Sequence, residues 1–207
     1  MQPVGLGPMH EEYPRRVIDV GIAEAEAIAS AAGMAYEGAH PVVALYATFL
    51  NRAFDQLLMD VALHKAGVTV VLDRAGITGA DGASHNGVWD IAMCSLIPGL
   101  RLAAPRDEDT LRAQLRQALD VDDAPTVLRY RKGPLPEPMP ALRSVGGVDV
   151  LFDEAGAGSS AKLLIVGTGA CAPDAIEAAR RLAADGLAVT VVDPCWLLPI
   201  SSALADM

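Results

Sequence analysis

Two glutamates, Glu24 and Glu26, stand at the start of an alanine-rich apolar segment, directly after a strand-like run that ends at Gly21. A carboxylate presented at such a turn can accept a hydrogen bond from a ligand or exchange a proton with it. The same positions also suit capping of a helix and compensation of its dipole. Residues two apart point about 200° apart around a helix axis, so only one glutamate can face a given site.

Aromatic and basic side chains are spaced by three residues in the segment Leu45–Gln56. At helical spacing Tyr46, Phe49 and Arg52 can lie on one side, where they offer a ring for stacking and a cation beside it. Taken by itself, the segment fits core packing with a snorkelling arginine better. The stacking hypothesis therefore needs support from neighbouring segments.

A long loop, residues 73–87, follows a run that reads as a fully buried strand. It contains four glycines together with Arg74, Asp81 and His85. Parallel sheets place their ligands at the carboxyl ends of strands, and a plain connector does not require this density of titratable side chains. The sequence therefore predicts a functional loop here, in which His85 is a candidate for acid or base chemistry because histidine can gain or lose a proton near neutral pH.

The elements that must position these residues alternate between β-branched runs and longer segments rich in Ala and Leu. This alternation predicts an α/β fold, with a parallel sheet of at least five strands covered by helices on both faces. The strands are expected at residues 17–20, 42–45, 68–72, 101–104 and 126–130. The helices are expected at residues 23–36, 48–65 and 107–119, the first of them buried.

A second α/β unit is predicted after a segment of extended character. Residues 132–147 contain Pro134, Pro136, Pro138 and Pro140, a composition typical of linkers. A strand at 163–166, a helix at 173–184 and a strand at 188–192 follow. We therefore divide the chain into a first domain at 1–131, the linker, and an incomplete α/β domain at 148–207, because one crossover unit cannot close a core.

Composition excludes several classes of protein. The net charge of −10 and the pI near 4.7 argue against nucleic-acid binding. No apolar run reaches about 18 residues and the N-terminal stretch lacks the apolar core of a signal peptide, so we expect a cytoplasmic protein without a membrane partner. Cys94, Cys171 and Cys195 are far apart, which predicts reduced packing residues and no zinc site or disulfide framework.

Several strings, in order and in register, resemble signatures of the 1-deoxy-D-xylulose 5-phosphate synthase family. The first three are the glutamate turn, the aromatic segment and the glycine-rich loop described above. The resemblance covers nearly the whole chain, and motifs that match in series are far more specific than any one of them. The matching strings are Asp19–Glu24, Tyr46–Gln56, Asp73–His85, Ala104–Glu108, Arg129–Gly133 and Val192–Pro199.

The resemblance implies a transketolase-like pyrimidine-binding domain and the cofactor thiamine diphosphate. By this analogy Glu24 hydrogen-bonds the aminopyrimidine ring and acts in catalysis, Phe49 stacks on the ring, and Arg52 lines the same wall. The implied substrates are pyruvate and glyceraldehyde 3-phosphate, joined with loss of CO₂ to make a precursor of isoprenoids and thiamine. Their expected ligands are Tyr46, Arg74 and Lys132 for the phosphate, and Asp81 and His85 for hydroxyls or protons.

Two departures from the family pattern affect the predicted site. Ala25 and Glu26 stand where the family has Gln-His, and Lys132 takes the phosphate-facing place of an arginine. The chain also lacks the Gly-Asp-Gly segment followed by Asn that holds Mg²⁺ and diphosphate in the family, so we predict no metal ligand here and place the Mg²⁺ site on a missing N-terminal domain.

These features predict a chain that is inactive alone, and that forms a homodimer or pairs with a diphosphate-binding domain. Two alternatives remain open. The chain can be the β-type subunit of a 2-oxo-acid dehydrogenase or split transketolase, or a non-catalytic partner of a full-length synthase.

Overall fold

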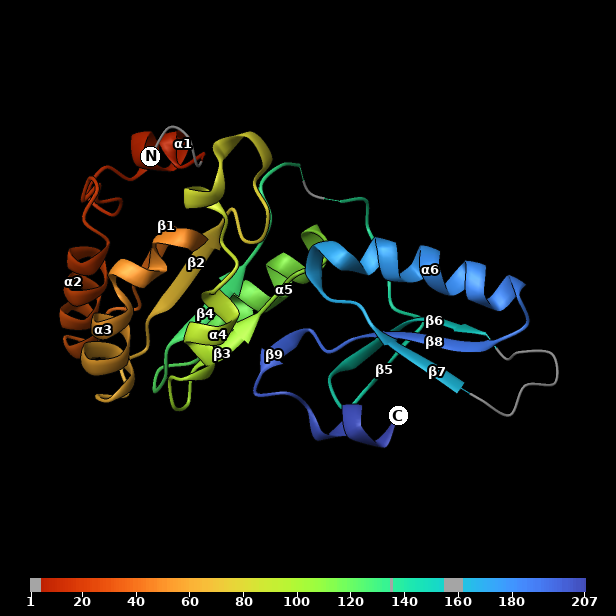
Figure 1. Cartoon of the computed structure of the whole chain (residues 1–207). Coiled ribbons are helices and arrows are strands. Elements are labelled where there is room, and N and C mark those ends of the chain that lie inside the picture. Colours follow the sequence, from red (N-terminus) through yellow and green to blue (C-terminus); the bar gives the residue numbers. More distant parts are fainter. Residues whose placement is uncertain (1–4, 135, 155–161) are drawn as a thin grey trace.

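The protein folds into two sheets, and helices pack on each of them (Figure 1). The computed structural model describes residues 5–134, 136–154 and 162–207. The first sheet has the strand order β1-β2-β4-β3-β9, and the second has the order β5-β6-β8-β7. The mixed α/β architecture predicted from the alternation of strand and helix patterns is confirmed.

Four parallel strands form the body of the first sheet, and their carboxyl ends lie at one edge. They are β1 (Val42–Tyr46), β2 (Thr69–Asp73), β3 (Arg101–Ala103) and β4 (Thr126–Arg129). Val70 and Val127 in the middle of the sheet are fully buried, as near-continuous apolar runs in covered parallel strands require. The fifth strand, β9 (Trp196–Leu198), comes from the far end of the chain and pairs antiparallel with β3.

Helices cover the two faces of this sheet unequally. One face packs against α2 (Glu24–Tyr36), the helical segment at residues 47–62, and α4 (Asp90–Ser95). The other face packs against α5 (Glu108–Leu119), whose Leu111 and Leu115 meet Leu128 of β4. A capping box between Asp107 and Thr110 begins α5, since each residue satisfies the other's backbone amide. The prediction of a sheet covered on both faces is confirmed.

Three details of the prediction are wrong. Residues 17–20 form no strand, since they have no neighbouring strand, and Ile18 is 64% exposed; the first sheet gains its fifth strand from β9 instead. The single helix predicted at 48–65 is divided into the 3₁₀ segment η2 (Ala47–Arg52), α3 (Phe54–Gln56) and the π segment η3 (Leu57–Ala62). Helix α2 is buried only along one side, with Tyr36 53% exposed.

The second sheet combines a hairpin with one crossover unit. A hairpin of β5 (Arg143–Val145) and β6 (Val148–Glu154) pairs antiparallel with β8 (Ala188–Asp193), and β7 (Lys162–Val166) lies parallel to β8. Helix α6 (Ala172–Ala184) covers one face, and the turn η7 (Ser202–Asp206) contacts the other. Strand β5 lies within the predicted linker, a feature that composition alone did not indicate.

Short helical turns complete the described chain. They are α1 (Gly7–Glu12) near the N-terminus, η4 (Gly79–Asp81) and η5 (Ala83–His85) in the glycine-rich loop, and η6 (Gly169–Cys171) before α6. Within the described residues, no helix has both the length and the apolar character needed to cross a bilayer.

Candidate functional site

The glycine-rich loop folds back onto the carboxyl end of β1. Gly76 and Gly87 exchange two backbone hydrogen bonds, with N–O distances of 2.8 and 2.9 Å, which closes the loop. Gly87 packs so tightly that a Cβ atom there would lie 2.5 Å from the Cβ of Ala47. The Thr48 hydroxyl donates to the Ser84 carbonyl at 3.0 Å. The loop is therefore fixed beside η2, the segment that carries the predicted aromatic residues.

A hollow of about 270 Å³ lies at this edge of the sheet, lined by Tyr46, Arg74, Asp81 and His85. The Arg74 guanidinium lies over the Tyr46 ring, 4.0 Å from its centroid, a cation–π arrangement. Arg74 also donates from Nη1 to Asp73 Oδ2 at 2.7 Å. The structure thus brings together four residues that the sequence placed on two separate segments.

Lys132, in the chain that leaves β4, contacts Asp81, one of the residues that line this hollow. Its Nζ donates to both carboxylate oxygens of Asp81, at 2.9 and 2.7 Å, across 51 positions of sequence. The hydrogen bond from Lys132 holds the pKa of Asp81 below its ordinary value. Asp81 therefore carries a full negative charge near neutral pH and orients the ammonium group.

Phe49 lies at the centre of the aromatic part of the site. Its ring is nearly coplanar with that of Tyr46, at a centroid distance of 6.0 Å, and meets His85 edge-on at 5.5 Å. The Arg52 guanidinium lies 4.6 Å from the Phe49 centroid. The Ser84 hydroxyl contacts His85 Nδ1 at 3.0 Å. Phe49 thus connects the hollow to the start of α2.

Glu24 and Glu26 take different roles, as their spacing required. Glu24 begins α2 with its side chain only 11% exposed, and its Oε2 lies 3.5 Å from Arg52 Nη1. Glu26 is exposed and accepts a hydrogen bond from the Ser30 hydroxyl at 2.8 Å. Of the two carboxylates, Glu24 is the one that faces the aromatic site.

The groups at this position fit the aminopyrimidine half of thiamine diphosphate in kind. A shielded carboxylate can bind a ring nitrogen, and an aromatic ring can stack on a flat heterocycle. Arg52 contacts both Glu24 and Phe49, and its side chain is 52% exposed, so a heterocycle stacked on Phe49 would require Arg52 to change rotamer toward solvent. Among the described residues, no three His, Cys, Asp and Glu side chains are grouped so that they could hold a metal ion.

Sequence reasoning assigned no role to three polar residues that support the site. Asp73 holds Arg74, and the fully buried Asp90 at the start of α4 holds Arg129 at the end of β4, with 2.7 Å between Asp90 Oδ2 and Arg129 Nε. Trp89 Nε1 donates to the Thr48 carbonyl at 3.3 Å. Of the three, only Asp73 could have been suspected from the sequence, because it stands at the end of a strand. The other two depend on contacts 39 and 41 positions apart.

A larger hollow, about 710 Å³, lies at the junction of the two sheets. None of the predicted site residues lines it. Its walls come from the turn between α4 and β3, the β5–β6 turn and the segment around β9, including Arg101, Gly146 and Trp196. Because the titratable and aromatic groups converge elsewhere, we place the candidate site at the smaller hollow.

Comparison with protein families and solved structures assigns the chain to two family domains and gives one structural neighbour. The family described as "Transketolase, pyrimidine binding domain" matches residues 2–138, and "Transketolase, C-terminal domain" matches residues 158–206. A solved structure titled "Split gene transketolase, inactive beta4 tetramer" superposes with a TM-score of 0.74 and 28% identity, covering 93% of this chain and 61% of that one.

Several similar proteins are named as 1-deoxy-D-xylulose-5-phosphate synthases. 1-Deoxy-D-xylulose-5-phosphate synthases 1 and 2 of Kitasatospora griseola are 58% and 59% identical over the whole chain, which spans 31% and 33% of those proteins. The synthase of Mycobacterium avium (strain 104) is 56% identical over 99% of the chain and 32% of its own length. The chain thus spans about one third of these relatives. It belongs to the transketolase family, as a pyrimidine-binding domain followed by transketolase C-terminal sequence, and is similar to 1-deoxy-D-xylulose-5-phosphate synthases along its whole length.

Proposed function

We propose that this chain supplies the aminopyrimidine-binding and phosphate-binding side of a thiamine-diphosphate-dependent 1-deoxy-D-xylulose 5-phosphate synthase. The observation that carries the proposal is the arrangement of Glu24, Arg52 and Phe49 beside the hollow of Arg74 and His85. The identity to named synthases supports the choice of reaction. A cytoplasmic location is part of the same proposal.

Glu24 and Phe49 are the proposed contacts to the cofactor. When bound, thiamine diphosphate supplies the carbanion chemistry, as it does in enzymes that use it. Phe49 stacks on the aminopyrimidine, and the Glu24 carboxylate shares a proton with a ring nitrogen of that group. Low exposure strengthens this hydrogen bond, because water competes less for a shielded carboxylate. Arg52 gives up its place on Phe49 and lines the wall of the site.

Arg74, Lys132 and Tyr46 are the proposed ligands of the glyceraldehyde 3-phosphate phosphate group. Guanidinium and ammonium groups form charge-assisted hydrogen bonds to phosphate oxygens. His85 contacts the Phe49 ring edge-on and lines the same hollow as Asp81, so in this proposal it exchanges a proton with a substrate hydroxyl. Pyruvate, the Mg²⁺ ion and the diphosphate are assigned to a diphosphate-binding domain on another part of the active assembly.

Reconstitution with a diphosphate-binding region tests this function. The purified chain is assayed with pyruvate, glyceraldehyde 3-phosphate, thiamine diphosphate and Mg²⁺, with and without the diphosphate-binding region of the Kitasatospora griseola synthase 1. We expect product only from the mixture. Glu24→Ala should abolish it, whereas the matched variant Glu26→Ala, on the exposed side of the same helix turn, should keep it.

Two outcomes contradict the proposal. Product formation by the chain alone would show that no second domain is required. Activity of the mixture that survives Glu24→Ala but not Glu26→Ala would show that the wrong carboxylate was assigned.

A split-transketolase subunit is the second candidate function. The solved neighbour, whose title describes an inactive tetramer of β subunits, favours a chain that needs another subunit. The same mixture supplied with a ketose phosphate donor in place of pyruvate separates the two reactions. A 2-oxo-acid dehydrogenase would instead require a lipoyl acceptor, and a non-catalytic partner would bind a full-length synthase without turnover of any of these substrates.

A further inference from the structure

Arg74 has a left-handed backbone conformation, with a φ angle of +60°. Residues with a Cβ atom rarely adopt this conformation, because the Cβ crowds a neighbouring carbonyl oxygen. Where they do adopt it, surrounding contacts must hold them, and such residues gather at functional sites. In the described part of the chain, Lys65, Arg74 and Cys195 are the non-glycine residues with positive φ, and of these only Arg74 lines the candidate site.

The carboxylate of Asp73 holds both the backbone and the side chain of Arg74. Its Oδ1 accepts from the Arg74 backbone amide at 2.7 Å, and its Oδ2 accepts from Arg74 Nη1 at 2.7 Å. Consecutive side chains of an extended strand point to opposite faces, so a contact this short between neighbours requires a turn between them. The left-handed conformation of Arg74 supplies that turn directly after β2.

The same turn places the guanidinium on the neighbouring strand. Asp73 is opposite Tyr46 in the β1–β2 register, and the Arg74 guanidinium lies over the Tyr46 ring at 4.0 Å from its centroid. The Arg74 carbonyl oxygen lies against Gly87, where a Cβ atom would be 2.9 Å from it. The conformation of this one residue therefore fixes a cation of the candidate site and the contact with the end of the glycine-rich loop.

We propose that Asp73 is a positioning residue that holds Arg74 in the left-handed conformation and so keeps its guanidinium on Tyr46 as a fixed anion-binding group. The inference rests on the proposed function in giving Arg74 a phosphate to bind. Among the described residues, an acceptor is bound to Nη1 alone of the three guanidinium nitrogens of Arg74, which leaves the other N–H groups for a ligand. A guanidinium of fixed orientation suits phosphate, because its planar N–H groups can bind two oxygens at once.

An ordinary ion pair at the end of β2 is the alternative role for Asp73. Such a pair would add stability, but it would require neither a left-handed backbone at position 74 nor a guanidinium held in one place. The two roles therefore differ in two measurable properties. One is the preference of position 74 for glycine over alanine, and the other is the mobility of the Arg74 side chain.

Glycine and alanine at position 74 test the backbone conformation. Both variants lack the guanidinium, so their difference depends on the backbone. Alanine is the more stable of the two in regular structure, but glycine adopts positive φ without steric cost, which reverses the order. We expect Arg74→Gly to melt about 2–4 °C above Arg74→Ala. Arg112, an exposed residue within α5, is the matched control position, where alanine should be the more stable residue.

Asp73→Asn tests the hold on the side chain. Asparagine keeps an oxygen for the Arg74 amide but replaces the second oxygen by an N–H donor, which cannot accept from Nη1. In NMR spectra of the intact chain, the Arg74 Nε–H signal should be displaced by the Tyr46 ring current and exchange slowly with water. In Asp73→Asn the displacement should be lost and exchange should be about tenfold faster or more, which corresponds to one hydrogen bond to a charged group. Glu108→Gln, which removes the partner of Arg112, is the matched control and should leave the Arg74 signal unchanged.

A titration with inorganic phosphate separates this inference from the proposed function. In the wild-type chain, phosphate should shift the Arg74 Nε–H signal until the site is saturated, while the signal of Arg129, held on the buried Asp90, stays in place. A guanidinium that is released in Asp73→Asn but never shifted by phosphate would support the positioning role and refute the phosphate role. An unchanged Arg74 signal in folded Asp73→Asn, or an Arg74→Ala protein as stable as Arg74→Gly, would overturn the inference. The glycine and alanine variants decide it if Asp73→Asn does not fold.

Discussion

Replacing Gly87 by Ala should destabilise the loop that forms the candidate site. The new Cβ would lie 2.5 Å from the Ala47 Cβ, 2.9 Å from the Arg74 carbonyl oxygen and 3.2 Å from the Ala75 Cα. All three atoms belong to backbone or to a Cβ attached directly to it, so no flexible side chain can move away. The loop or the start of η2 must shift instead.

The cost follows from the packing on both sides of Gly87. Overpacking of a well-packed site costs about 1–3 kcal/mol. We expect the upper half of this range, because Ala47 is fully buried and the two hydrogen bonds between Gly76 and Gly87 resist displacement of the loop. For a chain of this length, each kcal/mol lowers the melting temperature by about 2–4 °C.

Thermal and urea unfolding of Gly87→Ala measure this cost, with Gly33→Ala as the control. Gly33 lies within α2 with no atom within 4 Å of its added Cβ, so alanine there should stabilise the protein by about 0.5–1 kcal/mol. Opposite signs for the two variants are expected. A Gly87→Ala protein within 0.5 kcal/mol of the wild type would refute the packing of this loop on η2.

Two further predictions concern titrating groups. Burial raises the pKa of the Cys94 and Cys195 thiols to about 12, so a disulfide reagent at pH 8 should label exposed Cys171 rapidly and the other two only after denaturation. The hydrogen bond from Lys132 lowers the pKa of Asp81 below its ordinary value of 3.8. The contribution of this pair to folding stability is therefore present above pH 3.8 and is lost as the pH falls through the lower pKa of the folded state. In Lys132→Ala, NMR should show the pKa of the Asp81 carboxyl group moving back toward 3.8.

The regular elements were largely predictable because they depend on local pattern. Strands β1 to β4 and helices α2, α5 and α6 begin and end within one or two residues of the predicted positions. The strand expected at 17–20 failed because alternating apolar residues describe a strand only when a neighbour pairs with it. Strand β9 was missed for the converse reason, since its residues become a strand only through pairing with β3, where Leu198 meets Leu102 and Trp196 meets Ala103.

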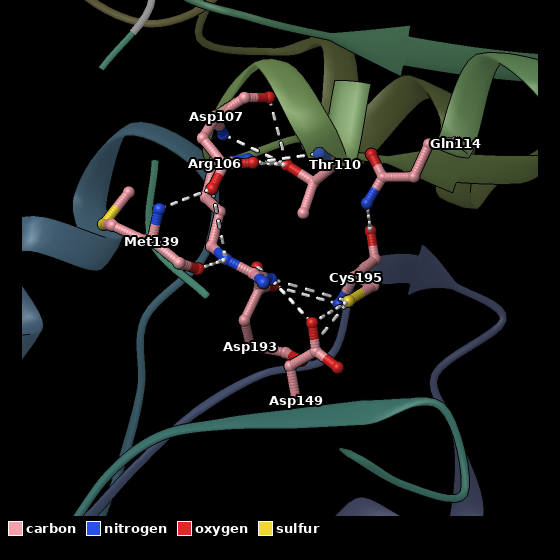
Figure 2. A network of polar contacts seen from close by, with 8 residues as sticks. All are labelled: Arg106, Asp107, Thr110, Gln114, Met139, Asp149, Asp193 and Cys195. Atoms are coloured by element: carbon pink, nitrogen blue, oxygen red, sulfur yellow. Dashed lines mark hydrogen bonds and ion pairs between the residues drawn. The ribbon is translucent and has the colours of Figure 1, made fainter. Parts of the chain in front are cut away.

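The candidate site was predictable in its residue types but not in its pairs. Spacing separated Glu24 from Glu26, because helix geometry is local. No spacing rule indicates that Lys132 meets Asp81, or that Arg106 meets Asp193 across 87 positions. Such contacts arise from the order of strands in the sheets, which sets the segments that lie side by side. Residues 132–147 were recognised as a linker by their prolines, but the anchoring of Met139 on the buried side chains of Arg106 and Asp107 required the structure (Figure 2).

The charges of the candidate site are balanced within the site itself. Three cations each have a carboxylate partner, at N–O distances of 3.5, 2.7 and 2.7 Å: Arg52 with Glu24, Arg74 with Asp73, and Lys132 with Asp81. Each pair holds a long cationic side chain in place. Fixing such a side chain costs up to about 2 kcal/mol in lost rotamer entropy. In the proposed function, a phosphate group would meet Arg74 and Lys132 already oriented by their carboxylate partners, and it would bind by taking over contacts from those carboxylates. Under that proposal, the local exchange of a carboxylate for a phosphate would matter more for binding than the net charge of −10.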